Sequence, residues 1–400
     1  MTGVQAVRSA LAVVVALAAA AACSDSSSGG GTASPPAARP STRAPGTDPL
    51  ATSPAPQNDA TAAAMRTYLT GLAAKKRFTG AALVVRRGQV LARFAAGQAD
   101  QARHIPVRPE TIFRLASVSK QFTAMLVLKQ RDRHRLGLDD KICAYVVPKY
   151  VKACPKAWRP ITIRQILDHT SGIPDISEMP DFFPKLPKPT TTQEIINRFV
   201  NKPLDFKPGT NWKYSNSGYI LAGAIIEKVS GKPYGTVLHD DITAPLGLAH
   251  TGYSTGSPPP GYAKGYMKLG SPAPPINGSQ ANAAGGVYSN VDDLARWDRS
   301  FGANKVAPPA TVTEALTAQA RCPSGGCLDS PSTGYAFGWL VDKLRGHRYL
   351  YHPGLLQGYH ASNAYLPDDD IAVVVLSNVQ DTDVNGINRH LATMALTGGS

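Results

Sequence analysis

Strand-like segments occur near both ends of this chain, and helical patterns fill the part between them. Residues 80–85 and 89–94 are apolar runs joined by Arg86-Arg87-Gly88, which predicts a β-hairpin. The last third contains four further strand-like runs, at residues 335–341, 347–356, 360–366 and 371–376. This order favours an α+β layout, in which the first hairpin and the last strands form one antiparallel sheet and the middle forms a mostly helical region.

The N-terminus has the pattern of an export signal. Residues 10–17 are apolar, follow a single basic residue, Arg8, and lead through an alanine run to Cys23. A membrane-spanning helix is the competing interpretation, but the run reaches the required ~20 apolar residues only if its alanines are counted. The four residues ending at Cys23 resemble a bacterial lipobox, although Ala20 stands where Leu is usual. We therefore expect residues 1–22 to be a signal peptide and Cys23 to anchor an exported membrane lipoprotein, with plain secretion as the alternative.

The next segment is rich in Ser, Gly, Pro, Thr and Ala and has no apolar periodicity. We expect residues 23–58 to form the anchor and a disordered tether, and residues 59–396 to form the folded domain. The formal charge of +14 comes from Lys and Arg in short scattered groups, which indicates a solvated surface. Adsorption to anionic envelope polymers or lipid headgroups is the second interpretation. We expect no nucleic-acid partner for an exported chain.

Four cysteines remain beyond Cys23, an even number in an exported chain, and this predicts two disulfides. Proximity in sequence favours Cys143–Cys154 and Cys322–Cys327; the first closes a loop worth ~3 kcal/mol in the chain-entropy description. A zinc site is the competing interpretation, but no second C-x2-4-C pair completes four ligands. No cofactor motif occurs, so we expect neither a metal nor a cofactor.

Ser117 and Lys120 stand three residues apart at a predicted helix start. Residues at this spacing share one helical face about 5–6 Å apart, so the Lys120 amine can take the proton of the Ser117 hydroxyl and make it a nucleophile. Free backbone N–H groups in the first turn would add positive potential where an oxyanion forms. The alternative is a serine cap on an ordinary helix, because this spacing also arises by chance.

Three further segments follow that make chance a poor explanation. The chain contains SVSK at residues 117–120, ILDHTSGIP at 166–174, YSN at 214–216 and HPG at 352–354. Together they resemble the S-x-x-K, L-L-x-H-T-S-G-I/L-P, Y-x-N and K-T-G or H-x-G signatures of the serine β-lactamase and penicillin-binding superfamily, closest to its class C β-lactamase, DD-carboxypeptidase and esterase branch. The resemblance implies the β-lactamase/DD-peptidase (transpeptidase-like) fold, an antiparallel sheet with flanking helices plus a mostly helical region.

The resemblance also implies roles for the matching residues. Ser117 would be the nucleophile that forms an acyl-enzyme, and either Lys120 or Tyr214 would be its base. Asn216 would donate to the substrate carbonyl or to Lys120. The competing interpretation makes Tyr214 a core aromatic and Asn216 a helix cap.

On the substrate side, the resemblance implies that His352 and Gly354 belong to the substrate-binding strand. The oxyanion hole would use the backbone N–H groups of Ser117 and Leu355. His169 lies in a recognisable segment, but we expect it to be structural, bonding the backbone of its own turn.

Pro353 departs from the family pattern. Relatives that process β-lactams or D-Ala-D-Ala peptides usually have Thr or Ser there, whose hydroxyl helps to bind the substrate carboxylate. His352 in place of Lys lowers the positive charge, because an unperturbed His titrates near ~6.5. Both changes weaken recognition of a carboxylate, so we expect esters or amides without a C-terminal carboxylate to be at least as good substrates as β-lactams.

The sequence therefore predicts an exported serine hydrolase that acts on a small-molecule or peptidoglycan-type acyl substrate. DD-carboxypeptidase, β-lactamase and esterase activities remain overlapping possibilities. A different class also stays open, a non-catalytic envelope-binding protein on the same scaffold. The complete set of Ser117, Lys120 and Tyr214 favours the enzyme.

Overall fold

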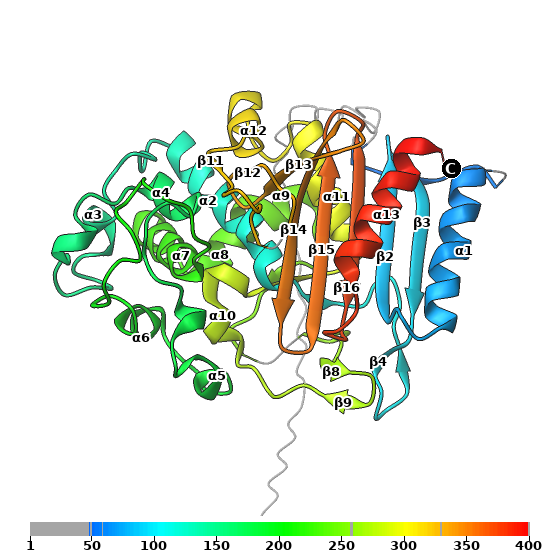
Figure 1. Cartoon of the computed structure of the whole chain (residues 1–400), viewed down its shortest axis with the longest axis horizontal. Coiled ribbons are helices and arrows are strands. Elements are labelled where there is room, and N and C mark those ends of the chain that lie inside the picture. Colours follow the sequence, from blue (N-terminus) through cyan, green and yellow to red (C-terminus); the bar gives the residue numbers. More distant parts are fainter. Residues whose placement is uncertain (1–47, 49, 58, 257–258, 329, 399–400) are drawn as a thin grey trace, which may run out of the picture. The chain divides into compact units, whose positions relative to one another are not determined.

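The computed structural model describes residues 48, 50–57, 59–256, 259–328 and 330–398. The predicted signal peptide, Cys23 and most of the predicted tether lie outside the described residues. A large sheet lies beside a mostly helical region (Figure 1).

The largest sheet has the strand order β1-β3-β2-β16-β15-β14-β13-β12-β11. Its strands are β1 (Ser53–Pro54), β2 (Gly80–Arg86), β3 (Gln89–Ala96), β11 (Ala320–Arg321), β12 (Gly334–Tyr335), β13 (Leu340–Leu344), β14 (His347–Leu356), β15 (Tyr359–Leu366) and β16 (Ile371–Ser377). Every pairing is antiparallel except that of β1 with β3, which is parallel. The prediction that the first hairpin joins the last strands is confirmed, because β2 pairs with β16.

Small sheets and the helices complete the fold. The short strands are β4 (Gln98–Asp100), β5 (Ile105–Pro106), β6 (Phe113–Arg114), β7 (Gly252–Tyr253), β8 (Tyr266–Lys268), β9 (Ser271–Pro272) and β10 (Val287–Ser289). The α-helices are α1 (Ala60–Ala74), α2 (Ser119–Asp132), α3 (Cys143–Val146), α4 (Ile163–Leu167), α5 (Phe182–Lys185), α6 (Thr192–Asn197), α7 (Asn216–Ser230), α8 (Tyr234–Leu238), α9 (Ala244–Leu246), α10 (Gly278–Gly285), α11 (Val291–Gly302), α12 (Pro309–Ala315) and α13 (Val384–Thr397).

Helices cover both faces of the large sheet, which explains why its central strands are continuously apolar. In β2, Ala82 and Val84 face the core under α1 and α13, whereas Leu83 and Val85 face the core that contains α2 and α7. Side chains alternate between the two faces of a strand, so a strand covered on both sides needs apolar residues at every position. Each buried Val or Leu contributes about 1.5–3 kcal/mol.

Part of the predicted tether, residues 50–57, is structured. Leu50 is buried, and the backbone N–H groups of Ser53 and Ala55 donate to the carbonyl oxygens of Gly88 and Val90 at 2.9 and 3.0 Å. Residues 50–57 are therefore a structured edge of the sheet and not a disordered tether. The composition misled the prediction because a two-residue parallel strand needs no apolar periodicity.

Both predicted disulfides are present. Cys143–Cys154 and Cys322–Cys327 have Cα–Cα distances of 5.6 and 5.2 Å. Among the described residues, no helix combines the length and apolarity needed to cross a membrane.

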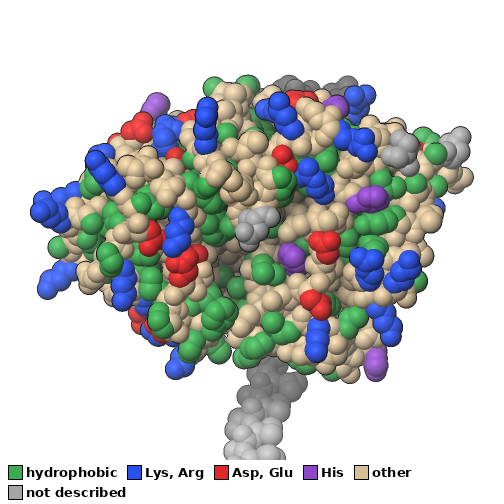
Figure 2. All heavy atoms as spheres, viewed as in Figure 1, with side chains coloured by type: hydrophobic (Ala, Val, Ile, Leu, Met, Phe, Trp, Pro, Cys, Tyr) green, Lys and Arg blue, Asp and Glu red, His purple; other side chains and the backbone are tan. Residues whose placement is uncertain are grey.

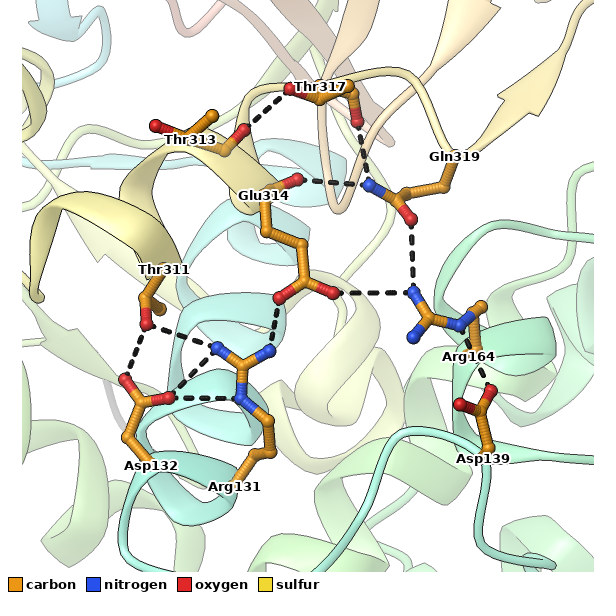
Figure 3. A network of polar contacts seen from close by, with 9 residues as sticks. All are labelled: Arg131, Asp132, Asp139, Arg164, Thr311, Thr313, Glu314, Thr317 and Gln319. Atoms are coloured by element: carbon orange, nitrogen blue, oxygen red, sulfur yellow. Dashed lines mark hydrogen bonds and ion pairs between the residues drawn. The ribbon is translucent and has the colours of Figure 1, made fainter.

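A network of ion pairs holds α12 against the helical region (Figure 3). The Glu314 carboxylate of α12 accepts from Arg131 of α2, and it lies 3.4 Å from the Arg164 guanidinium of α4. One carboxylate thus connects three helices.

We expect Glu314→Gln to lower the free energy of unfolding by about 1 kcal/mol, the upper range for a partly exposed pair. Glu178→Gln is the matched control, because Lys213 is the one ion-pair partner of Glu178 among the described residues and Glu178 is 54% exposed; a loss under ~0.5 kcal/mol is expected there. Urea unfolding at low and high salt measures both variants. Equal losses in the two variants would contradict the network.

Candidate active site

Ser117 lies in a 3₁₀ turn, η1 (Ala116–Val118), between β6 and α2. The prediction that Ser117 opens the helix is wrong by two residues, since α2 begins at Ser119. β10 holds the turn on both sides, because Leu115 N donates to Val287 O at 3.0 Å and Val287 N donates to Ser119 Oγ at 3.0 Å. Ala116 has φ 46°, a left-handed conformation that costs about 1–2 kcal/mol outside glycine. The surrounding bonds keep this strained backbone in place before the nucleophile.

Lys120 is fully buried and its amine contacts the Ser117 hydroxyl. Nζ lies 3.1 Å from Ser117 Oγ, 2.7 Å from Asn216 Oδ1 and 2.9 Å from the Ala284 carbonyl oxygen. Burial lowers the pKa of Lys120 from 10.5 to about 7, and the Asp175 carboxylate opposes this change. A large share of the amine is therefore uncharged at neutral pH, as a base must be.

Tyr214 lies beside the same amine, with its ring centre 4.8 Å from Lys120 Nζ. The ring is partly exposed, but its hydroxyl oxygen is buried and has no hydrogen bond of ordinary geometry within the described residues. Burial raises the pKa of Tyr214 well above 10, against a smaller lowering by the Ser117 hydroxyl. Tyr214 is thus a neutral phenol that can donate a proton.

Asn216 is the first residue of α7, and it joins Lys120 to a residue that the sequence did not single out, Asp175. The Asn216 Oδ1 accepts from Lys120, and Nδ2 donates to the two Asp175 oxygens at 3.1 and 3.0 Å. We expect Asn216 to donate to the substrate carbonyl or to Lys120; in this structure its amide nitrogen donates to Asp175 instead, and toward Lys120 the amide accepts. The sequence signal was present, because Asp175 directly follows the ILDHTSGIP segment.

His352 is near the site but does not line the cavity beside Ser117. Its Nδ1 lies 2.7 Å from the Pro353 carbonyl oxygen, and its Nε2 lies 3.0 Å from the Tyr335 hydroxyl. Because a carbonyl only accepts, Nδ1 carries the proton and Nε2 accepts from Tyr335. Burial lowers the pKa of His352 to about 3. The expectation of an unperturbed histidine in contact with substrate is thus corrected: burial keeps this ring neutral and makes it a support of β14.

His169 supports the Tyr214 loop from behind. Its Nδ1 accepts from Ser215 N at 3.1 Å, and its ring centre lies 4.5 Å from that of Tyr214. We expected His169 to bond the backbone of its own turn, but it bonds a segment 46 residues away. The structural role is retained, with a different partner.

β14 passes so close to the serine turn that residue 354 must be glycine. A Cβ added to Gly354 would lie 2.1 Å from Leu115 O and 3.3 Å from Ser117 N. The ladder between β13 and β14 ends at Tyr351, so the following residues of β14 face η1 instead. Within the described chain, the Ser117 N–H has no hydrogen-bond acceptor. This geometry leaves a donor beside the nucleophile for a developing oxyanion, and Leu355 is the adjacent predicted donor.

A cavity of about 660 Å³ opens beside Ser117. Pro353, Tyr214, Asn216 and Asp175 contribute to its wall. None of the described lining residues is Lys or Arg. Much of the remaining wall is apolar, from Ile176, Phe182, Phe183, Leu186, Ile220 and Leu355.

On the face seen in Figure 2, the Lys and Arg side chains are scattered and mixed with Asp and Glu, and they form no single basic patch. Within the described ranges, no three His, Cys, Asp or Glu side chains are grouped so that they could hold a metal ion.

Comparisons with known proteins find related sequences and solved structures over most of the chain. A family model described as Beta-lactamase matches residues 59–395. Penicillin-binding protein 4* of Bacillus subtilis is 28% identical over 340 residues, 79% of this chain and 72% of the relative. Esterase EstB of Burkholderia gladioli is 28% identical over 311 residues, 66% of this chain and 76% of the relative. A solved D-stereospecific amidohydrolase from Streptomyces is 27% identical, with a TM-score of 0.67 over 83% of this chain and 98% of that one. The chain spans 61% to 76% of the length of the first curated relatives that it matches.

Proposed function

The chain belongs to the β-lactamase family, and from this premise we propose that it is a serine hydrolase that forms an acyl-enzyme on Ser117. Its α+β fold is the one found in penicillin-binding and β-lactamase-fold proteins, as predicted. The observation that carries the proposal is the 3.1 Å contact between Ser117 Oγ and a buried Lys120 amine whose pKa is about 7.

In the proposed reaction, Lys120 accepts the hydroxyl proton as Ser117 Oγ bonds to the substrate carbonyl carbon. The tetrahedral oxyanion is stabilised by the backbone N–H groups of Ser117 and Leu355. The intermediate then collapses, and the leaving alcohol or amine takes the proton of the Tyr214 hydroxyl. The Lys120 ammonium then gives a proton to Tyr214, so the phenol is restored and the amine is neutral again. In the second half, the neutral Lys120 amine takes a proton from water as the water oxygen bonds to the acyl carbon. The bond from that carbon to Ser117 Oγ then breaks, Lys120 returns the proton to Ser117 Oγ at 3.1 Å, and the acid is released.

The cavity supports neutral substrates with an apolar group. Its described wall has no Lys or Arg, it includes the Asp175 carboxylate, and Pro353 has no side-chain donor. His352 supplies no charge, because burial holds its pKa far below neutral pH. The names of the relatives, an esterase and a D-stereospecific amidohydrolase, are consistent with ester and amide substrates. We therefore propose esters or amides without a carboxylate near the scissile bond as the preferred class.

The substrate class is tested with p-nitrophenyl butyrate, its analogue that ends in a carboxylate, nitrocefin and a D-Ala-D-Ala peptide. We expect kcat/KM for the neutral ester to exceed that for the carboxylate analogue by about tenfold or more, since a carboxylate loses ~1.4 kcal/mol or more on entering a cavity whose described wall offers it no Lys or Arg. The matched variant is Phe183→Lys, because this side chain lines the cavity and is 62% exposed; the added cation is expected to reduce the preference for the neutral ester. Nitrocefin turnover well above that of the ester would contradict the proposal.

We further propose that the enzyme is exported and held at the outer surface of the cell membrane through Cys23, where peptidoglycan-type acyl substrates are available. The support is the signal-peptide and lipobox pattern of the sequence. A secreted form without the anchor is the alternative.

A further inference from the structure

We propose that Asp175 is a positioning residue: acting through the Asn216 amide, its carboxylate orients the Lys120 amine so that the lone pair faces Ser117. The inference rests on the proposed hydrolase function and adds to it a residue that sets the direction of proton transfer. Asp175 reaches the site as the N-cap of a 3₁₀ turn, η3 (Ile176–Glu178), where it accepts from Ser177 N at 3.2 Å.

Asp175 fixes the orientation of the Asn216 amide. The carboxylate is buried, at 6% exposure, and receives Nδ2 of Asn216 on both oxygens as well as Asn216 N at 3.1 Å. A carboxylate only accepts hydrogen bonds, whereas an amide has a donating and an accepting end. The flipped amide would face Asp175 with its oxygen, acceptor against acceptor. The amide oxygen is therefore directed to Lys120.

The hydrogens of Lys120 are then determined by its neighbours. A neutral amine has two N–H bonds and one lone pair. Asn216 Oδ1 at 2.7 Å and the Ala284 carbonyl oxygen at 2.9 Å are both acceptors, so each takes one N–H. The lone pair is left for the third neighbour, Ser117 Oγ at 3.1 Å. This arrangement assigns Lys120, and not the phenol of Tyr214, as the base for acylation.

Lys120 alone could not impose this arrangement. A neutral amine can donate to the Asn216 oxygen or accept from the Asn216 nitrogen, so it does not select between the two amide orientations. In the flipped orientation the amide would occupy the lone pair and leave no base for Ser117. Asp175 excludes that state because only one orientation satisfies both neighbours.

Asp175 also affects the charge state of the amine. The titratable side chains that face Lys120 lie on the 166–175 segment, the loop before α7, α7 itself and β14. They are His169, Asp175, Tyr214, Tyr219 and His352. Burial keeps both histidines and both tyrosines neutral at pH 7. Of these groups, Asp175 is the one whose charge opposes the lowered pKa of Lys120.

The test is the pH profile of Asp175→Asn with p-nitrophenyl butyrate between pH 5.5 and 9. Because Lys120 must be neutral to act, we expect the wild-type rate to rise with pH through about 7. Removing the Asp175 charge favours the neutral amine, so the rise is expected about 0.5 pH unit or more lower. We also expect kcat to fall about 10- to 100-fold through misorientation, with KM changed less than threefold.

The matched control is Asp168→Asn, which removes a carboxylate buried in the same segment that accepts from Thr170. Its kcat is expected within threefold of wild type and its pH profile unchanged. If Asp175→Asn does not fold, Asp175→Ser, which retains an acceptor for Ser177 N, is measured in its place. An unchanged profile and kcat in the Asp175 variant, or an equal loss in Asp168→Asn, would overturn the inference.

A double-mutant cycle shows whether Asp175 acts through Asn216. The double variant Asp175→Asn/Asn216→Ala is expected to match Asn216→Ala within about threefold, since the second change removes the route of the first. If the double variant instead loses the product of the two single-variant factors in kcat, the inference is overturned while the Ser117 hydrolase proposal stands. A wild-type protein without Ser117-dependent turnover would overturn both.

Discussion

Ser117→Ala is expected to lower kcat/KM for p-nitrophenyl butyrate by at least about 10³-fold, because no other hydroxyl of the site meets the requirements of the nucleophile. Covalent catalysis needs an oxygen within hydrogen-bond reach of a base. Ser117 Oγ is 3.1 Å from Lys120 Nζ, whereas the nearby Ser119 hydroxyl accepts from Val287 N and belongs to the support of the turn. What activity remains would come from binding and the oxyanion donors alone.

The alanine variant should fold normally. Ser117 is partly exposed, and its hydroxyl interacts with Lys120 and Tyr214, two side chains of the site itself. We expect the melting temperature to stay within about 2 °C of wild type. Ser230→Ala, at the end of α7 and outside the site, is the control for handling and should keep full activity. A folded Ser117→Ala protein that retains more than a tenth of the activity would contradict the proposed nucleophile.

Lys120→Met is expected to lower kcat by about 10²–10⁴-fold, the range for removal of a general base. Methionine has a similar length and no basic atom, so it fills the space without accepting a proton. The pH dependence gives a second readout. The wild-type rate should rise through about pH 7 as Lys120 loses its proton, and the residual rate of the variant should lack this rise.

The pH readout separates the two candidate bases. Burial opposes the ionisation of Tyr214, so it remains a phenol far above neutral pH. If Tyr214 were the base, the rate would therefore not rise near pH 7. A Lys120→Met protein that keeps the rise, or loses less than tenfold in kcat, would show that Lys120 is not the base.

The architecture was largely predictable from the sequence because its signals are local. Residues 80–85 and 371–376 are apolar at every position, and α7 is capped at its C-terminus by Gly231, whose φ of 70° suits a glycine. The parallel edge at Ser53–Pro54 was missed, since its bonds to Gly88 and Val90 depend on the hairpin and not on its own composition.

Some features of the candidate site could also be predicted from the sequence, and others could not. The Ser117, Lys120, Tyr214 and Asn216 side chains were identified from motif order, and the structure brings them together. The neutral state of His352 could not be predicted, because it results from complete burial against distant segments.

Asp175 was missed for a related reason. Aspartate after a Gly-x-Pro turn has the appearance of an ordinary cap, and that is one of its roles here. Its second role appears only when α7 brings the Asn216 amide onto the carboxylate. The position of Asp175 directly after the ILDHTSGIP segment places it near the site, but the sequence does not show that its carboxylate accepts from the Asn216 amide.

The central claim is that this protein forms a covalent acyl-type intermediate on Ser117. The most direct measurement is the intact mass of the wild-type protein and of Ser117→Ala after exposure to a fluorophosphonate. We predict one stoichiometric adduct on the wild type, located on the peptide that contains Ser117, and none on the variant. A wild-type protein that gains no mass, or a variant that gains the same mass, would contradict it and favour a non-catalytic binding protein on this scaffold.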